Sequence, residues 1–466
     1  MVDMIKSPTA ELANFVVGLE YEDVPREVID SIKLHVLDTI GVGLFGSTTP
    51  WGKLIADFVK DWDRKRESQV WGHRIKTSCQ NAALANGTMA HGFELDDTHR
   101  TAILHPGPVT VTSALAVAER KGGIDGKQFM TAVLAGYEVV TRVGMSVGVS
   151  HLRRGYHPIG NCGPFGAAAA AAKVLNLDKN KTINALGIAG TQGAGLMAAQ
   201  YGAMVKRMHA GRASQSGVIG ALLAEQGFTG IDNILEAEYG GFCSTVSDEC
   251  DLSKLTIGLG KHFEILNTGI KPYACSASCH TAIDAAGALA KEYLIDTSII
   301  EKIVVKTTTA TKKHVGWEYR PQSITSAQMN LAYGISVMLL EGEAFVNQYT
   351  DDKIVDPEVL SLIKKIEVVA DPELDRLGPD YRHSVTVQIR MEDGSVFGPD
   401  RVDYPKGSPE NPMTQEEVKK KFRSLATRVT GEKILEQIVT SIDDLERMKD
   451  VIELAKILIP QKSIHI

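Results

Sequence analysis

Four cationic or potentially cationic side chains lie between two segments rich in Ala and Gly, residues 183–200 and 213–227. Small residues are often fully buried, so both segments are predicted to form packed, buried helices. A buried charge without a partner destabilises a fold by roughly several kcal/mol. The sequence therefore predicts a negative group here, either a carboxylate of the chain or an anionic ligand, beside Lys206, Arg207, His209 and Arg212.

Length and charge limit the kinds of protein that this chain can be. At 466 residues it exceeds the usual size of one hydrophobic core, so two domains are expected. A content of 44% hydrophobic and 23% charged residues is typical of a soluble globular protein. The net charge of −7 argues against general binding to nucleic acid or to anionic membranes. A small anionic substrate stays compatible with it, because a local cationic pocket can lie within an acidic protein.

The cysteines do not indicate a metal site. Among the six, only Cys275 and Cys279, followed by His280, approach the spacing of metal ligands, and structural zinc sites need four ligands in recognisable pairs. No basic leader precedes an apolar run at the N-terminus, and we expect no 18-residue apolar span elsewhere. The sequence therefore predicts a cytoplasmic protein with reduced thiols, no bound metal and no membrane partner.

The first 270 residues read as successive helices. The predicted helices are a segment from Pro25 to about Gly43, residues 108–120, residues 127–147, and one that opens at Gly163.

After residue 270 strands alternate with helices. Helices are predicted at 279–294 and 326–341, and strands at 302–308, 365–369 and 385–390, the last followed by a hairpin turn at 392–395. A Pro- and Gly-rich linker then leads to the capping box of Thr414 and Glu417, which starts a helical tail. The fold class predicted is mainly α with a second α+β domain: residues 1–270 and 405–466 form the helical domain, and 271–404 form the α+β domain.

Further candidate residues cluster between His91 and His105. Three carboxylates and three histidines lie in this stretch, among them Asp97, which suits acid–base or hydrogen-bonding work. A surface acidic loop is the alternative. A metal site ranks below acid–base or hydrogen-bonding work, because HxH or HxxxD spacing is missing. Two single residues join them: His157 precedes an Ala-rich helix, and Lys271 precedes a proline where the two domains should meet.

Together these residues suit one kind of chemistry. Lys206 and Lys271 could bind carboxylates, while His105 and His157 titrate near neutrality and could move a proton. Fixed cations accelerate reactions that build negative charge beside a carboxylate, and no cofactor is needed. Proton abstraction, decarboxylation and elimination all belong to this class.

The chain resembles the MmgE/PrpD family, which includes 2-methylcitrate dehydratase, cis-aconitate decarboxylase and an iminodisuccinate epimerase. The segments that carry the resemblance are Glu94-Leu-Asp-Asp-Thr98, Gly163-Pro-Phe-Gly-Ala167, Met204-Val-Lys-Arg-Met-His-Ala-Gly-Arg-Ala213 and Ile270-Lys-Pro-Tyr-Ala-Cys275. Residues 195–202, 239–242 and 314–317 are most similar to the fungal cis-aconitate decarboxylase branch.

The resemblance implies an all-helical large domain, an α+β lid domain, a homodimer and cofactor-free chemistry. It places these residues around the substrate: Glu94, Thr98, His105, His157, Lys206, Lys271 and Tyr319. Two positions depart from the family pattern. Glu94 stands where many members have Asp, and Ser276 stands where the animal decarboxylases have a histidine, with His280 four positions on.

The leading hypothesis is a lyase that acts on a small di- or tricarboxylate. Lys206 and Lys271 would hold carboxylates, His157 and His105 would transfer the proton, and Asp97 or Glu94 would orient a histidine, with His209 and Arg212 as further binding groups. Decarboxylation of cis-aconitate to itaconate is the first expectation and dehydration of 2-methylcitrate the second. An isomerase or epimerase, or a scaffold that has lost activity, are the alternatives.

Overall fold

The computed structural model describes residues 7–460, and the chain divides into two compact units. The larger unit contains the described residues up to Ala198, Met204–Ile270 and the segment from Thr414 onward. The smaller unit contains Ala199–Ala203 and Lys271–Met413, so the Pro- and Gly-rich segment after residue 404 groups with the smaller unit. The chain is mainly helical with an α+β part, which confirms the predicted fold class.

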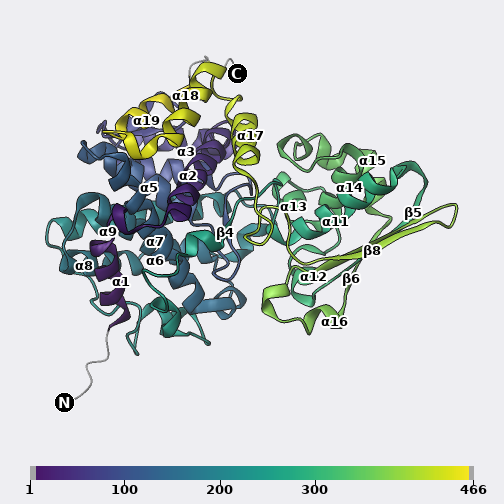
Figure 1. The fold of residues 1–466 in the computed structure, drawn as a ribbon, viewed down its shortest axis with the longest axis horizontal. Helices are drawn as coiled ribbons and strands as arrows, with labels where there is room; N and C mark the ends of the chain where they lie inside the picture. The colour runs from purple at the N-terminus through teal and green to yellow at the C-terminus, as the bar shows by residue number, and fades with distance from the viewer. Residues whose placement is uncertain (1–6, 461–466) are drawn as a thin grey trace. The chain divides into compact units, whose positions relative to one another are not determined.

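The larger unit is built on helices (Figure 1). They are α1 Pro8–Gly18, α2 Arg26–Gly46, α3 Pro50–Trp62, α4 Cys79–Ala90, α5 Gly107–Lys121, α6 Gly126–Arg153, α7 Pro158–Leu175, α8 Lys179–Gly190, α9 Val205–Glu225, α10 Phe242–Val246, α17 Gln415–Ala426, α18 Glu432–Asp443 and α19 Ile452–Ile457. The tail helix α17 begins at the predicted capping box, because Thr414 and Glu417 make both of its hydrogen bonds.

The resemblance implied that the larger unit is all helical, but this unit also contains short strands. Two short antiparallel sheets join its helices: β1 Ser68–Val70 pairs with β2 Ile75–Thr77, and β3 Thr98–His99 pairs with β4 Thr268–Gly269. The second sheet therefore connects the loop after α4 to the end of the segment Met204–Ile270.

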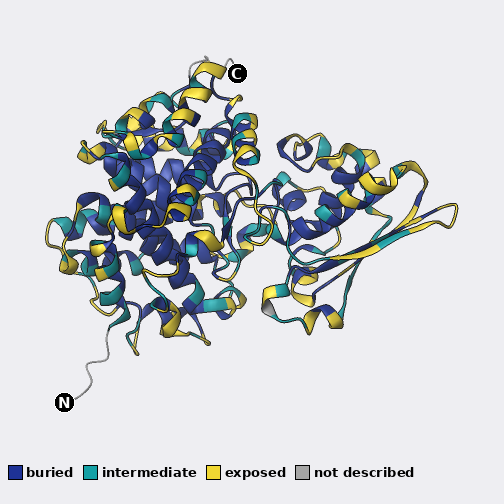
Figure 2. Cartoon of the chain, viewed as in Figure 1, coloured by how far each residue is buried: buried dark blue, intermediate teal, exposed yellow. Residues whose placement is uncertain are grey.

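Close helix packing explains the run of small residues. Helix α7 packs on α6 and α9, and α9 packs on α4. A Cβ at Gly217 would lie 2.4 Å from the Cβ of Ala167, and one at Gly87 would lie 2.8 Å from the Cα of Gly211. These helices can therefore approach one another only because the contact positions lack larger side chains. Figure 2 shows that the helices of the larger unit's interior are mostly buried.

Three expectations for the helices were wrong. Helix α7 begins at Pro158, where proline suits the first turn, so Gly163 lies inside it. Helix α8 ends at Gly190, and only a short 3-10 turn, Met197–Tyr201, follows before α9. Helix α6 does contain an apolar window long enough to cross a membrane, but 83% of that window is buried in the fold. This burial is what a core helix requires.

The smaller unit contains a four-stranded sheet of order β6-β5-β7-β8. Its elements are α11 Ala277–Tyr293, β5 Ile300–Thr307, α12 Thr309–Val315, α13 Ile324–Gln328, α14 Leu331–Glu341, α15 Pro357–Ile363, β6 Ile366–Ala370, α16 Pro372–Asp375, β7 Val385–Met391 and β8 Val396–Val402. Strand β5 runs parallel to β6 and antiparallel to β7. Burial alternates along β7, and α11 packs against β7 and β8, so one face of the sheet carries the core of this unit.

Candidate active site

The stretch between α4 and α5 carries three buried carboxylates, and each has different partners. Asp97 is the anchor of this loop. Its Oδ2 accepts a hydrogen bond from the Tyr137 hydroxyl at 2.6 Å and lies 3.0 Å from His35 Nδ1, and its Oδ1 accepts from the Gly107 backbone N–H at 3.0 Å. The carboxylate of Asp97 therefore fixes the loop to α2, α5 and α6. Its contact with a predicted catalytic histidine is made by the main chain, since His105 Nδ1 donates to the Asp97 carbonyl at 2.6 Å.

Glu94 is the negative partner of the basic cluster. Its Oε1 accepts hydrogen bonds from both Lys206 Nζ and Arg207 Nη1, in the first turn of α9. All three side chains are at least 95% buried. Of the two alternatives that the sequence left open, a carboxylate of the chain is therefore present, although the net charge of these three groups is still +1.

Arg212 lies apart from this ion pair. Its side chain is exposed on α9 and donates to Gln215, one turn further along the same helix. The arrangement is that of a surface arginine. Among the hydrogen bonds of the described residues, that of the Arg212 side chain goes to Gln215 and to none of the other predicted site residues.

Four histidines lie next to one another in the larger unit. The ring centroids of His105 and His91 are 5.1 Å apart, those of His91 and His157 are 5.7 Å apart, and those of His157 and His209 are 5.1 Å apart. The Nδ1 atoms of His157 and His209 lie 2.9 Å apart, so one ring donates to the other. The ring that accepts this hydrogen bond is neutral. His91 directly follows α4, His157 directly precedes α7, His209 lies in α9, and His105 lies in the loop before α5.

The environment favours neutral rings. Burial first, and then the nearby charge of Lys206, hold the pKa of His157 well below its usual range and lower the pKa of His209 to about 4. Burial also lowers the pKa of His91, although Asp96 opposes that shift. The effect of Lys206 on all three pKa values indicates that its ammonium lies within electrostatic reach of this histidine group.

His91 and Asp96 are site residues that the sequence did not single out. His91 Nδ1 lies 2.7 Å from Asp96 Oδ2, and His105 Nδ1 lies 3.4 Å from the same oxygen. The ligand atoms of His91, Asp96 and His105 lie within 4.8 Å of one another, which is close enough for a metal ion. A direct hydrogen bond joins two of them, and the positive charge of Lys206 acts on His91, so we assign the three to a hydrogen-bonded group. Both residues lay inside the His91–His105 cluster, but spacing alone could not rank its three carboxylates.

The C-terminal tail also reaches this loop. Lys421 on α17 donates from Nζ to the Leu95 carbonyl at 2.7 Å and lies 2.6 Å from Asp38 Oδ1 on α2. Leu95 stands between Glu94 and Asp96, so Lys421 fixes the backbone that directs both carboxylates. Burial raises the pKa of Asp38 to about 6, although Lys421 opposes the rise.

Two predicted residues, Lys271 and Tyr319, belong to the smaller unit. Lys271 is 98% buried. The Tyr319 hydroxyl donates to the Ile354 carbonyl at 3.1 Å, and burial raises the pKa of this phenol well above its usual value. The convergence of Lys271 with Lys206 stays a prediction, because each lysine belongs to a different unit. Thr98, in β3, is partly exposed and pairs with Gly269.

His280 is oriented by the backbone that precedes its helix, α11. Its Nε2 donates to the Cys275 carbonyl at 3.2 Å, and only 2% of the residue is exposed. Ser276 is the N-cap residue of α11 and is buried as well. The described hydrogen bond therefore directs His280 toward the backbone that precedes α11.

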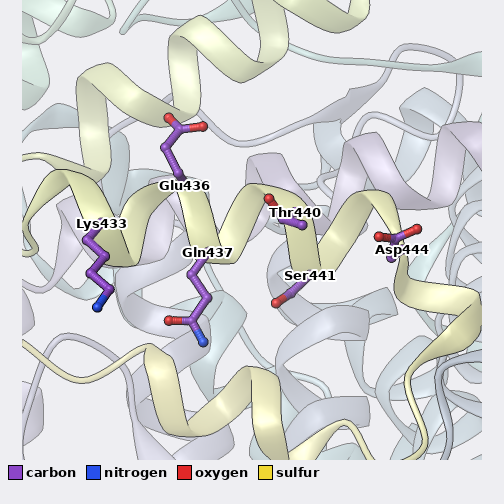
Figure 3. A pocket seen from close by; sticks show the side chains of 6 residues that line it. All are labelled: Lys433, Glu436, Gln437, Thr440, Ser441 and Asp444. Carbon is purple, nitrogen blue, oxygen red and sulfur yellow. The ribbon is translucent and has the colours of Figure 1, made fainter.

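A shallow surface depression on α18 has a volume of about 510 Å³ (Figure 3). The residues that line it recur every three or four positions, so they share one face of the helix, and all carry polar or charged side chains. They are Lys433, Glu436, Gln437, Thr440, Ser441 and Asp444. This composition is typical of the solvated face of an amphipathic helix, and none of the predicted site residues lies there.

A helical unit with a buried histidine–carboxylate group and a separate α+β unit define a two-domain, mainly helical protein. Residues 10–254 match the MmgE/PrpD N-terminal domain, and residues 273–445 match the MmgE/PrpD C-terminal domain. The chain belongs to the MmgE/PrpD family, which confirms the resemblance seen in the sequence. The second match extends through α17 and α18, two helices that group with the larger unit.

Three relatives illustrate the range of similarity. A cis-aconitate decarboxylase-like protein of Aspergillus oryzae is 34% identical over 97% of both chains. The cis-aconitate decarboxylase of Aspergillus terreus is 31% identical over 97% of this chain and 95% of its own. A mitochondrial 2-methylcitrate dehydratase of Yarrowia lipolytica is 23% identical over 83% of this chain and 78% of its own.

Proposed function

We propose that this chain is a lyase that decarboxylates cis-aconitate to itaconate. Relatives with a decarboxylase name align over nearly the full chain, and the dehydratase relative is more distant. The structural observation that carries the proposal is a hydrogen-bonded pair of histidines, His157 and His209, within electrostatic reach of the buried Lys206. Such a group can stabilise a developing negative charge and supply a proton at the same place.

The reaction needs a sink for one electron pair and a source of one proton. Loss of CO2 breaks one C–C bond, and the electron pair stays on an allylic carbanion that is conjugated with a neighbouring carboxylate. Lys206 stabilises this charge electrostatically, and a proton is then added to carbon. His157 and His105 are the candidate donors, because a bound polyanion favours the imidazolium form of a nearby histidine. The His105 Nδ1–H is already committed to the Asp97 carbonyl, so Nε2 is the atom that can exchange a proton.

Several further features belong to the proposal. Lys271, Tyr319 and Thr98 would contact the substrate, and the substrate would be a tricarboxylate bound without a cofactor. We further propose that the chain forms a homodimer, lies in the cytoplasm and has no nucleic-acid or membrane partner.

Dehydration of 2-methylcitrate is the second candidate, favoured by the similarity to the Yarrowia dehydratase. Proton abstraction without CO2 loss, as in an epimerase, could use the same histidines.

One set of incubations in heavy water separates these reactions. Purified protein with cis-aconitate is expected to release one CO2 per itaconate, which takes up one deuterium at carbon. An alkene formed from 2-methylcitrate without CO2 would establish the dehydratase instead. Exchange of an α-hydrogen without either product would indicate an epimerase, and the absence of all three would contradict an active lyase.

A further inference from the structure

The carboxylate of Glu94 binds two buried cations that have the chemistry of a carboxylate-binding site. Its Oε1 accepts from Lys206 Nζ and from Arg207 Nη1, and a carboxylate of a substrate could make the same two contacts. The chain therefore carries, within the candidate site, an internal group with the chemistry of the substrates proposed above.

The backbone holds Glu94 in this position at a cost. Glu94 has a φ of 57°, in the left-handed region that residues with a side chain rarely adopt. The next residue, Leu95, is fixed by the hydrogen bond from Lys421, which belongs to the C-terminal tail. Two separate features thus direct the carboxylate, and such strain persists only where its surroundings enforce it.

The charges define what Glu94 does to a ligand. Lys206, Arg207 and Glu94 sum to +1, and without the Glu94 charge they would sum to +2. Each carboxylate that a ligand brings into this field is attracted less when Glu94 is ionised, so the penalty grows with the number of carboxylates.

We propose that Glu94 is a specificity-determining residue that sets how steeply affinity rises with the number of carboxylates on the ligand. The inference rests on the proposed function, because it assumes that polycarboxylates bind beside Lys206. Glu94 lowers the gain in affinity that each further carboxylate of a ligand brings, so it weakens the preference for highly charged acids while polycarboxylates still bind.

The test compares three saturated, unreactive acids that carry one, two or three carboxylates: butyrate, glutarate and propane-1,2,3-tricarboxylate. Calorimetric Kd values are measured at one pH and one ionic strength for the wild type and for E94Q, which keeps the shape and removes the charge. E94Q is expected to tighten binding of the tricarboxylate at least ~10-fold more than binding of butyrate.

A matched control removes a different buried carboxylate. Glu138 pairs with Arg142 in α6 at 3.2 Å, and both side chains are fully buried. E138Q should leave the ratio of tricarboxylate to butyrate affinity as in the wild type. If E94Q does not fold, E94D retains the charge but draws it back by one methylene, and a smaller shift in the same direction, ~3-fold, is expected.

The outcomes separate the two proposals. An affinity ratio in folded E94Q, or in folded E94D, that equals the wild-type ratio overturns the role of Glu94 while polycarboxylate binding stands. A wild-type protein that binds none of the three acids overturns the proposed function itself, and the role of Glu94 with it.

Discussion

Replacement of Lys421 by Met should destabilise the larger unit in a way that depends on pH. At pH 7, Lys421 neutralises the fully buried Asp38 and donates to the Leu95 carbonyl. Removal of one partner of a buried ion pair typically costs about 3–5 kcal/mol, because the other charge stays buried. We therefore expect the free energy of unfolding to fall by about that amount at pH 7.

The pKa of Asp38 gives the sign of the pH effect. Its folded value, about 6, lies above the unfolded value of about 3.9, so the folded state binds this proton more tightly. In the wild type, this group alone makes stability fall as the pH rises from about 4 to 6, by about 3 kcal/mol in total. At pH 5 Asp38 is already mostly protonated in the native protein, so K421M should lose chiefly the hydrogen bond to Leu95, about 1.5–3 kcal/mol.

Guanidinium denaturation followed by tryptophan fluorescence measures this loss. Trp51, Trp62 and Trp71 are three of the four tryptophans and lie in the larger unit, so they report chiefly on its unfolding. K419M on the same helix is the control, because Lys419 pairs with a partly exposed Asp443 and should cost less than about 1 kcal/mol.

The double variant D38N/K421M completes a mutant cycle. It should show a coupling of at least about 2 kcal/mol at pH 7 and little coupling at pH 5. An equal loss for K421M at both pH values, or no rescue by D38N, would refute the assignment of Asp38 as the partner that titrates.

Replacement of Lys206 or His157 by Ala should lower the kcat for itaconate formation at least ~100-fold, the usual scale for a positioned proton-transfer group, and near wild-type rates would exclude this site. Arg212→Ala should change kcat/KM less than ~3-fold, because the side chain is exposed and bonded to Gln215; a larger loss would mean that Arg212 contacts the substrate. Asp97→Asn should lower the denaturation midpoint, because an amide cannot accept all three hydrogen bonds of the carboxylate. The free energy of unfolding should fall by about 1.5–3 kcal/mol or more. An unchanged midpoint would contradict the anchoring role.

Local patterns predicted most of the helices because their signals lie within a few residues. The capping box at Thr414 places the start of α17, and the alternation at 385–390 finds β7. The start of α7 was missed because Gly163 and Pro164 look like a helix start, whereas Pro158 provides the actual first turn. A proline within α7 is a tertiary exception that no local pattern reveals.

The partners in the site could not be predicted in the same way. Glu94 and Lys206 are 112 positions apart, and Leu95 and Lys421 are 326 apart. The sequence indicated that buried cations need a carboxylate, which was sound, but only the packing of α4 against α9 selects Glu94 as that carboxylate. His91 was passed over because a histidine before a glycine has no distinguishing spacing.

The three carboxylates of the loop show why composition alone could not assign roles. Glu94 serves two cations, Asp96 serves two histidines, and Asp97 serves Tyr137, His35 and a backbone N–H. Each is buried, where a carboxylate needs partners, and the partners of each are of a different kind. The order Glu-Leu-Asp-Asp is therefore fixed by three separate sets of partners, and a substitution at each position should disturb a different property: ligand charge at Glu94, histidine chemistry at Asp96 and loop stability at Asp97.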